Sequence, residues 1–145
     1  MTRLSARGRL TTEGAIGIGV IALIGIAVWS FIGQDVRLCK QVFAGLVTGD
    51  QGVRQKIDWS HFVALDANVG SVYTQLPDGE KTPYEQTFVR NFSLGFAKAQ
   101  ADPSGFTNWR AQGDRTVTVD YPAKSKTAVF TLSENGKQVT RLAWK

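Results

Sequence analysis

The sequence predicts an α+β protein: one N-terminal transmembrane helix, then a small domain whose helices pack on a curved antiparallel sheet of about four strands. Three observations support this class. Residues 14–33 are almost wholly apolar, residues 34–101 carry apolar side chains mainly at helical spacing, and residues 106–144 alternate between polar and apolar side chains. Helices followed by antiparallel strands indicate a domain with its helices on one face of the sheet.

The apolar run of residues 14–33 has Ser30 as its only polar side chain. A helix of this length spans about 30 Å, which matches the hydrocarbon core of a bilayer. A helix in a soluble core would have a polar face, and this one has none. The run is longer than that of a cleavable signal peptide, and no A-x-A site follows it. We therefore expect an uncleaved signal anchor, with Trp29 at the membrane interface.

The charges on either side of this run predict its orientation. Three arginines precede it within residues 1–13, whereas Arg37 and Lys40 follow it and are partly offset by Asp35. An excess of positive charge before the span favours a cytoplasmic N-terminus. We expect residues 1–13 to be a cytoplasmic tail, and residues 34–145 to be a domain exported across the cell (inner) membrane.

Small residues recur three or four positions apart along the same run. They would let the backbone of a second helix approach closely, which favours helix association in lipid. The expected partners are therefore other integral membrane proteins of a complex, together with the lipid bilayer; a homo-oligomer is the alternative. The residues of this predicted packing seam are Ala15, Gly19, Ala22 and Gly25.

The exported part begins with helices. Residues 34–48 place apolar side chains three or four positions apart, which predicts that the helix continues. Gly49 ends it, and a short second helix is expected over residues 51–57. Residues 61–65 and 71–76 are predicted to be two short strands of a hairpin.

A long helix is expected over residues 82–101, after a Pro-Asp-Gly turn at 77–79. Thr82 and Glu85 have the spacing of a capping box, with Pro83 at the first helical position. Asp102-Pro103 ends the helix. Its aromatic residues recur at steps of four and are predicted to be core, with the lining of a ligand cavity as the alternative: Tyr84, Phe88, Phe92 and Phe96.

The C-terminal third of the chain is predicted to be strands, at residues 106–112, 116–121, 127–133 and 138–144. The last two strands are joined through Asn135-Gly136. This dipeptide between two alternating runs predicts a hairpin with a type I′ turn.

Composition excludes several kinds of chemistry. The single Cys and single His exclude cysteine-based zinc sites and most histidine-rich metal sites, and no phosphate-binding motif is present. No cofactor and no metal are therefore expected. The formal net charge of +5 is spread thinly, without a basic stripe, so nucleic-acid binding is not expected. Cys39 is expected to be buried, with an intermolecular disulfide as the alternative.

Acid–base chemistry has only scattered candidates: Asp58, His61, Asp66, Tyr73 and Asp120. No spacing rule or second partner links them, so we do not expect an enzyme. A pocket in the exported domain would be lined by aromatic residues and by the single histidine. Its candidate residues are Trp59, His61, Phe88, Phe92, Phe96 and Trp109.

The order of these elements, with Asp58-Trp59, the aromatic helix and a final Leu-Ala-Trp-Lys, resembles the nuclear-transport-factor-like, cystatin-like α+β cone. The resemblance covers about residues 36–145 and is closest to small membrane-tethered extracytoplasmic members. It implies a curved sheet that wraps a long helix and leaves a pocket. Some members are enzymes, and many are scaffolds or subunits of secretion and transport assemblies. We therefore expect a non-catalytic single-pass membrane subunit or assembly factor; a ligand-binding or enzymatic cone domain is one alternative.

A second resemblance concerns the N-terminus. Gly8 and Glu13 have the spacing of the processing site and the fifth mature residue of type IV prepilins, although Arg9 would stand at the first mature position. This resemblance implies cleavage after Gly8. A pilin-like filament subunit is therefore the other alternative.

Overall fold

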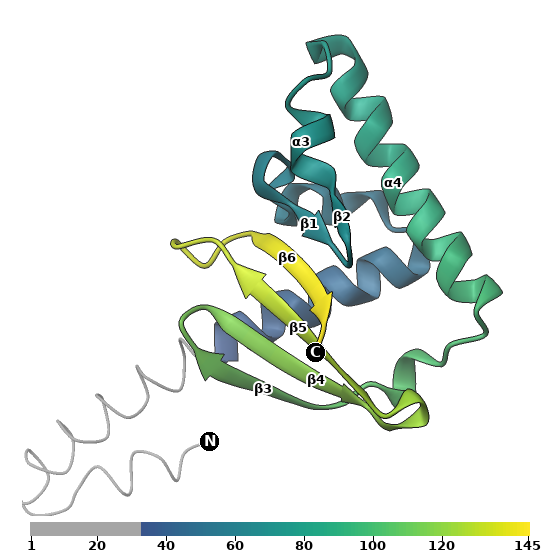
Figure 1. Ribbon diagram of the computed structural model, residues 1–145, viewed down its shortest axis with the longest axis vertical. Coiled ribbons are helices and arrows are strands. Elements are labelled where there is room, and N and C mark those ends of the chain that lie inside the picture. The colour runs from purple at the N-terminus through teal and green to yellow at the C-terminus, as the bar shows by residue number, and fades with distance from the viewer. Residues whose placement is uncertain (1–32) are drawn as a thin grey trace, which may run out of the picture. The chain divides into compact units, whose positions relative to one another are not determined.

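A computed structural model describes residues 33–145 of the chain, which include the compact unit Gln34–Lys145 (Figure 1). Several predictions concern residues outside this range. They are the cytoplasmic tail, the apolar run apart from Gly33, the packing seam of Ala15, Gly19, Ala22 and Gly25, and the prepilin residues Gly8 and Glu13.

The predicted fold class needs two corrections. Within residues 33–145, no helix combines the length and the apolar character needed to cross a membrane. The first described helix, residues 33–48, carries Asp35, Arg37 and Lys40. The sheet is also larger than predicted and is not purely antiparallel. It has six strands, in the order β2-β1-β6-β5-β4-β3, and β1 pairs with β6 in parallel.

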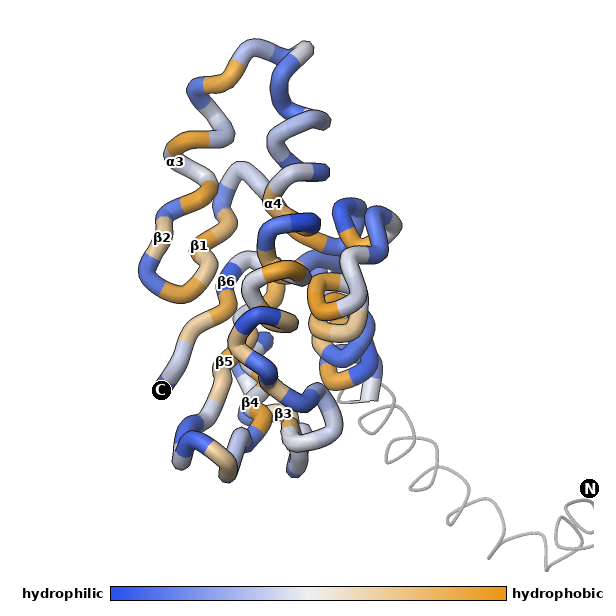
Figure 2. The backbone as a smooth tube through the Cα atoms, turned by 90° about the vertical axis from the view of Figure 1, so that its right-hand side faces the viewer, coloured by the Kyte–Doolittle hydropathy of each residue, from blue (hydrophilic) through white to orange (hydrophobic). Residues whose placement is uncertain are grey.

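The helix of residues 33–48 is amphipathic, as predicted. Figure 2 shows both hydrophobic and hydrophilic residues along it, and Cys39, Val42 and Leu46 are buried against the sheet. It ends at Gly49, whose φ of +75° is accessible to glycine without strain. The short helix η1 (Gln51–Lys56) follows, and the side chain of Asp50 caps it by accepting a hydrogen bond from the N–H of Gly52.

The predicted strand at residues 71–76 is wrong. After the turn η2 (Trp59–His61), the chain forms strands β1 (Val63–Ala64) and β2 (Ala67–Asn68) and then the helix α3 (Val69–Tyr73). The reason is local capping, because the side chain of Asn68 accepts a hydrogen bond from the N–H of Ser71 at 3.1 Å.

The long helix α4 (Asp78–Lys98) begins earlier than predicted, with Pro77 as its N-cap. The predicted turn at 77–79 and the capping box at Thr82 are both wrong, and Pro83 lies inside the helix. Glu85 does not reach back to the N-terminus. Its carboxylate accepts hydrogen bonds from Arg54 and Tyr73 instead, so contacts from other elements replace the predicted cap. The short turn η3 (Pro103–Gly105) then leads into the sheet.

The four C-terminal strands match their predicted positions to within one residue at either end. They are β3 (Thr107–Gly113), β4 (Thr116–Tyr121), β5 (Lys126–Leu132) and β6 (Val139–Trp144), with the turn η4 (Pro122–Lys124) between β4 and β5. The two-residue turn with positive φ lies at Asp114-Arg115, between β3 and β4. At the predicted type I′ position only Gly136 has a positive φ, because the loop between β5 and β6 is longer than a two-residue turn.

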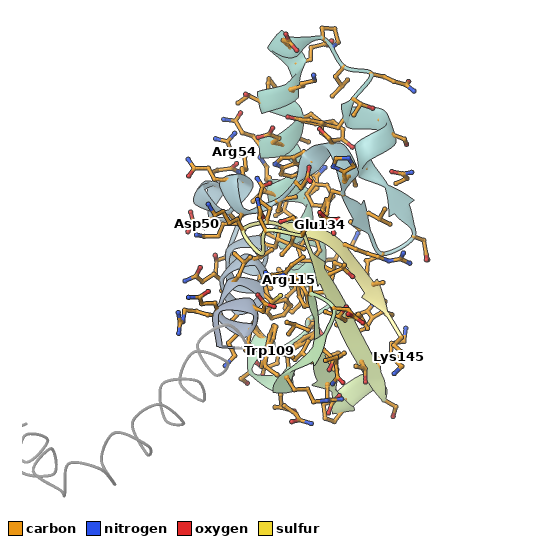
Figure 3. The ribbon with its side chains drawn as sticks, turned by 90° about the vertical axis from the view of Figure 1, so that its left-hand side faces the viewer. Asp50, Arg54, Trp109, Arg115, Glu134 and Lys145 are labelled. Atoms are coloured by element: carbon orange, nitrogen blue, oxygen red, sulfur yellow. The ribbon has the colours of Figure 1, made fainter. Side chains whose placement is uncertain are left out.

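One face of this sheet is covered by the helix of residues 33–48 (Figures 1 and 3). Phe43 from the helix packs against Trp109 of β3, with ring centroids 5.7 Å apart. At one end of the helix, Asp35 pairs with Arg115 in the β3–β4 turn at 2.9 Å. The helix and the sheet therefore form the main core of the described unit. The helix α4 lies beside it.

Candidate ligand-binding cavity

A half-open cavity of about 330 Å³ lies between the C-terminal half of α4 and the sheet. Its wall is apolar, and Asn91 is the one polar side chain among the described residues that line it. Apolar clefts of this size that contain few polar groups are the usual form of small-molecule sites. The lining residues are Phe43, Leu65, Asn91, Phe92, Gly95, Phe96, Ala99, Ala101, Phe106, Ala128, Phe130, Leu142 and Trp144.

Small residues from both α4 and the sheet contribute to the cavity wall. Gly95 and Ala99 line the cavity from the helix, and Ala128 lines it from β5. A Cβ atom added at Gly95 would meet no atom within 4 Å. Only Val89 is buried among the 21 residues of α4, so the helix is not packed closely against the sheet along its whole length.

The N-terminal half of α4 is held by a polar contact. The hydroxyl of Tyr73 donates a hydrogen bond to Glu85 at 2.6 Å, and Arg54 lies 3.2 Å from the other oxygen of the same carboxylate. This hydrogen bond raises the pKa of Tyr73 to about 12. The contact ties α4 to both α3 and η1.

An aromatic cluster supports the same half of α4. Trp59, Phe62 and Phe88 meet edge to face, with ring centroids between 5.4 and 5.8 Å apart. Trp59 also stacks on Tyr73. The C-terminal half of α4 makes a hydrogen bond from Ser93 to the carbonyl of Val47. The cavity lies along this C-terminal half, from Asn91 to Ala99.

The six residues predicted for a pocket do not come together in one place. Phe92 and Phe96 line the cavity. Trp59 and Phe88 belong to the aromatic cluster, and Trp109 packs against Phe43 and Phe130. His61 is exposed on the surface and pairs with Asp58 at 2.9 Å.

The acid–base candidates are also dispersed. Asp58 and His61 lie beside the β5–β6 loop, in a polar surface depression that Ser133 and Thr140 also line. Tyr73 is engaged by Glu85, and Asp66 is exposed. Asp120 accepts hydrogen bonds from Arg110, Asn108 and Thr127, and these bonds lower the pKa of its carboxyl group, that from Arg110 most. Among residues 33–145, no group of three or more potential ligands is placed to hold a metal ion.

Sequence reasoning missed the cavity residues of the sheet. Ala128 and Phe130 are two residues apart on their strand, as are Leu142 and Trp144. This spacing was a signal that each pair shares one face of the sheet, because residues two apart on a strand do so. Gly95, in the middle of the aromatic stripe, was a second signal. Cys39 is buried as expected, and burial raises the pKa of its thiol, which disfavours the reactive thiolate.

No family model, no curated protein and no solved structure matches the chain. The resemblances to the cone fold and to prepilins therefore remain predictions from the sequence.

Proposed function

We propose that residues 34–145 form a non-catalytic binding domain that takes an apolar ligand into the cavity between α4 and the sheet. The observation that carries this proposal is the composition of the cavity wall, in which aromatic and small aliphatic residues surround a single amide, Asn91. Transfer of an apolar ligand from water to such a wall contributes about 25 cal/mol per Å² of buried apolar surface.

The non-catalytic part of the proposal is supported by the absence of titratable groups from the wall. None of the described residues that line the cavity has an acid or base side chain. A general acid or base must lie within hydrogen-bond reach of the atom on which it acts. The candidates Asp58, His61, Tyr73 and Asp120 have partners outside this cavity.

The binding proposal is tested with decanol that carries a trifluoromethyl group at the end of its chain, added to the full-length protein. In the cavity the fluorine atoms would lie beside aromatic rings, so fluorine NMR should show a shifted signal from the bound probe. Gly95→Leu should abolish this signal, because leucine would occupy open space inside the cavity. The fold should be preserved, since leucine is a better helix former than glycine by up to about 1 kcal/mol.

The matched control is Gly79→Leu. Gly79 is also in α4, and a Cβ atom added there would likewise meet no atom within 4 Å, but this residue does not line the cavity. The control variant should keep the bound signal at the wild-type intensity. If the wild-type protein gives no bound signal, or if Gly95→Leu retains it, the cavity does not bind apolar ligands and the proposal is wrong.

The predicted role in a membrane complex remains part of the proposal. Its support is the apolar amino-acid sequence of residues 14–33 and the small residues within it. In this role the protein would be a non-catalytic subunit or assembly factor located at the cell membrane. Its exported domain would then present the cavity outside the cytoplasm.

A further inference from the structure

The cavity, called the slot from here on, extends along the C-terminal half of α4. Its lining on the helix runs from Asn91 to Ala99. Eight steps of a helix cover about 12 Å, which is long relative to the small volume of the cavity. A long, narrow and apolar space accommodates one extended hydrocarbon chain better than a compact ring system. This inference rests on the proposed function, since it concerns the ligand of the same cavity.

A cation lies beside the wall of the slot, over the ring of Trp144. Lys126 is on the same side of β5 as Ala128 and Phe130, which line the cavity, because alternate residues of a strand share a face. Its Nζ atom lies 5.3 Å from the centroid of the Trp144 ring, and Trp144 is itself a lining residue that is 40% exposed. The ammonium group therefore lies beside a partly exposed residue of the cavity wall.

The ammonium group of Lys126 is available to a ligand. Among residues 33–145, no carboxylate lies within 4.0 Å of it. Asp120 pairs with Arg110, and Asp102 accepts hydrogen bonds from the N–H and hydroxyl groups of Ser104. Capping N–H groups bond to the carbonyls of Gly95, Phe96 and Ala97 at the C-terminus of α4, which reduces the negative potential at this end of the helix.

We infer that the ligand of the cavity is a single-chain amphiphile with a carboxylate head group, of the fatty-acid type. Its hydrocarbon chain lies in the slot between α4 and the sheet, and its carboxylate pairs with Lys126 beside Trp144. A fatty acid is ionised at neutral pH, so its carboxylate is complementary in charge to the ammonium group of Lys126.

The test compares decanoate with decanol, both labelled with fluorine at the end of the chain, on the full-length protein at low ionic strength. The wild-type protein should bind decanoate about fivefold more tightly than decanol, which is the size expected for one partly exposed charge pair. Salt should reduce this preference. Lys126→Gln should remove the preference and leave the affinity for decanol unchanged, whereas Lys126→Arg should keep the preference.

Lys137→Gln is the control, because Lys137 is an exposed lysine in the β5–β6 loop and, unlike Lys126, does not lie over the ring of the lining residue Trp144. It should leave both affinities unchanged. If the wild-type protein binds decanol and decanoate equally, or if Lys126→Gln keeps the preference, the carboxylate assignment is wrong while the apolar binding site stands. If neither probe binds, the proposed function fails, and this inference fails with it.

Discussion

Phe62→Ala should destabilise the domain by about 3–5 kcal/mol, the cost of removing a fully buried aromatic ring. The side chain of Phe62 is 0% exposed. Its ring contacts Trp59 and Phe88, with centroid distances of 5.8 and 5.6 Å. Phe62 thus joins the η2 segment to α4, and the space left by its ring is enclosed by rigid aromatic neighbours. A natural domain has only about 5–15 kcal/mol of total stability, so this loss would bring it close to unfolding.

The loss is measured by urea unfolding of the full-length protein, followed by circular dichroism. Val72→Ala is the control, because Val72 is also apolar but is 49% exposed on α3. It should change the free energy of unfolding by no more than about 0.5 kcal/mol. A loss at Phe62 as small as that at Val72 would show that the aromatic cluster does not hold α4 in place.

Gly70→Ala should also destabilise the domain strongly, by about 3 kcal/mol or more. The N–H group of Gly70 donates a hydrogen bond to the carbonyl of Phe62 at 2.8 Å, which draws α3 close to η2. A Cβ atom at this position would collide with the backbone carbonyl of Ser60. A backbone group cannot rotate away as the end of a side chain can, so the two segments must separate.

Gly79→Ala is the matched control for this substitution. It makes the same chemical change in a helix, at a position where a Cβ atom meets nothing within 4 Å. Alanine is the better helix former, so this variant should be as stable as the wild-type protein or more stable by up to about 1 kcal/mol. The same unfolding measurement compares the two. Equal stabilities for Gly70→Ala and Gly79→Ala would contradict the close packing of α3 against η2.

The elements that could be predicted from the sequence are those whose signal is local. The four C-terminal strands alternate polar and apolar residues, and the helix of residues 33–48 has a clear apolar face that ends at Gly49. The elements that could not be predicted depend on distant partners. The strand β1 pairs in parallel with β6, 78 positions away in sequence, and nothing near residues 63–64 indicates this partner.

The start of α4 shows how tertiary contacts override a local motif. Thr82, Pro83 and Glu85 have a well-formed capping pattern, yet the helix begins at Asp78. Glu85 binds Tyr73 and Arg54, which come from two other elements. The error in the predicted strand at residues 71–76 has a different and local cause, because the side chain of Asn68 caps a helix there.

Only part of the cavity lining could be predicted from the sequence. The aromatic stripe of α4 indicated which face of the helix is apolar, and Phe92 and Phe96 do line the cavity. Whether such a stripe is core or cavity depends on how far the helix stands from the sheet. The space between them also depends on the small side chains of Gly95, Ala99 and Ala128, which come together only in the folded domain.

The most direct test of the central claim is to map where a ligand binds. Decanoate with a photoreactive diazirine at the end of its chain is irradiated with the full-length protein, and the modified peptides are identified by mass spectrometry. We expect the modification to fall within the cavity wall, on residues 91–99 of α4 or on the lining residues of β5 and β6, and to be lost in Gly95→Leu but not in Gly79→Leu. Modification scattered over other surfaces, or undiminished in Gly95→Leu, would contradict the assignment of the cavity as the binding site.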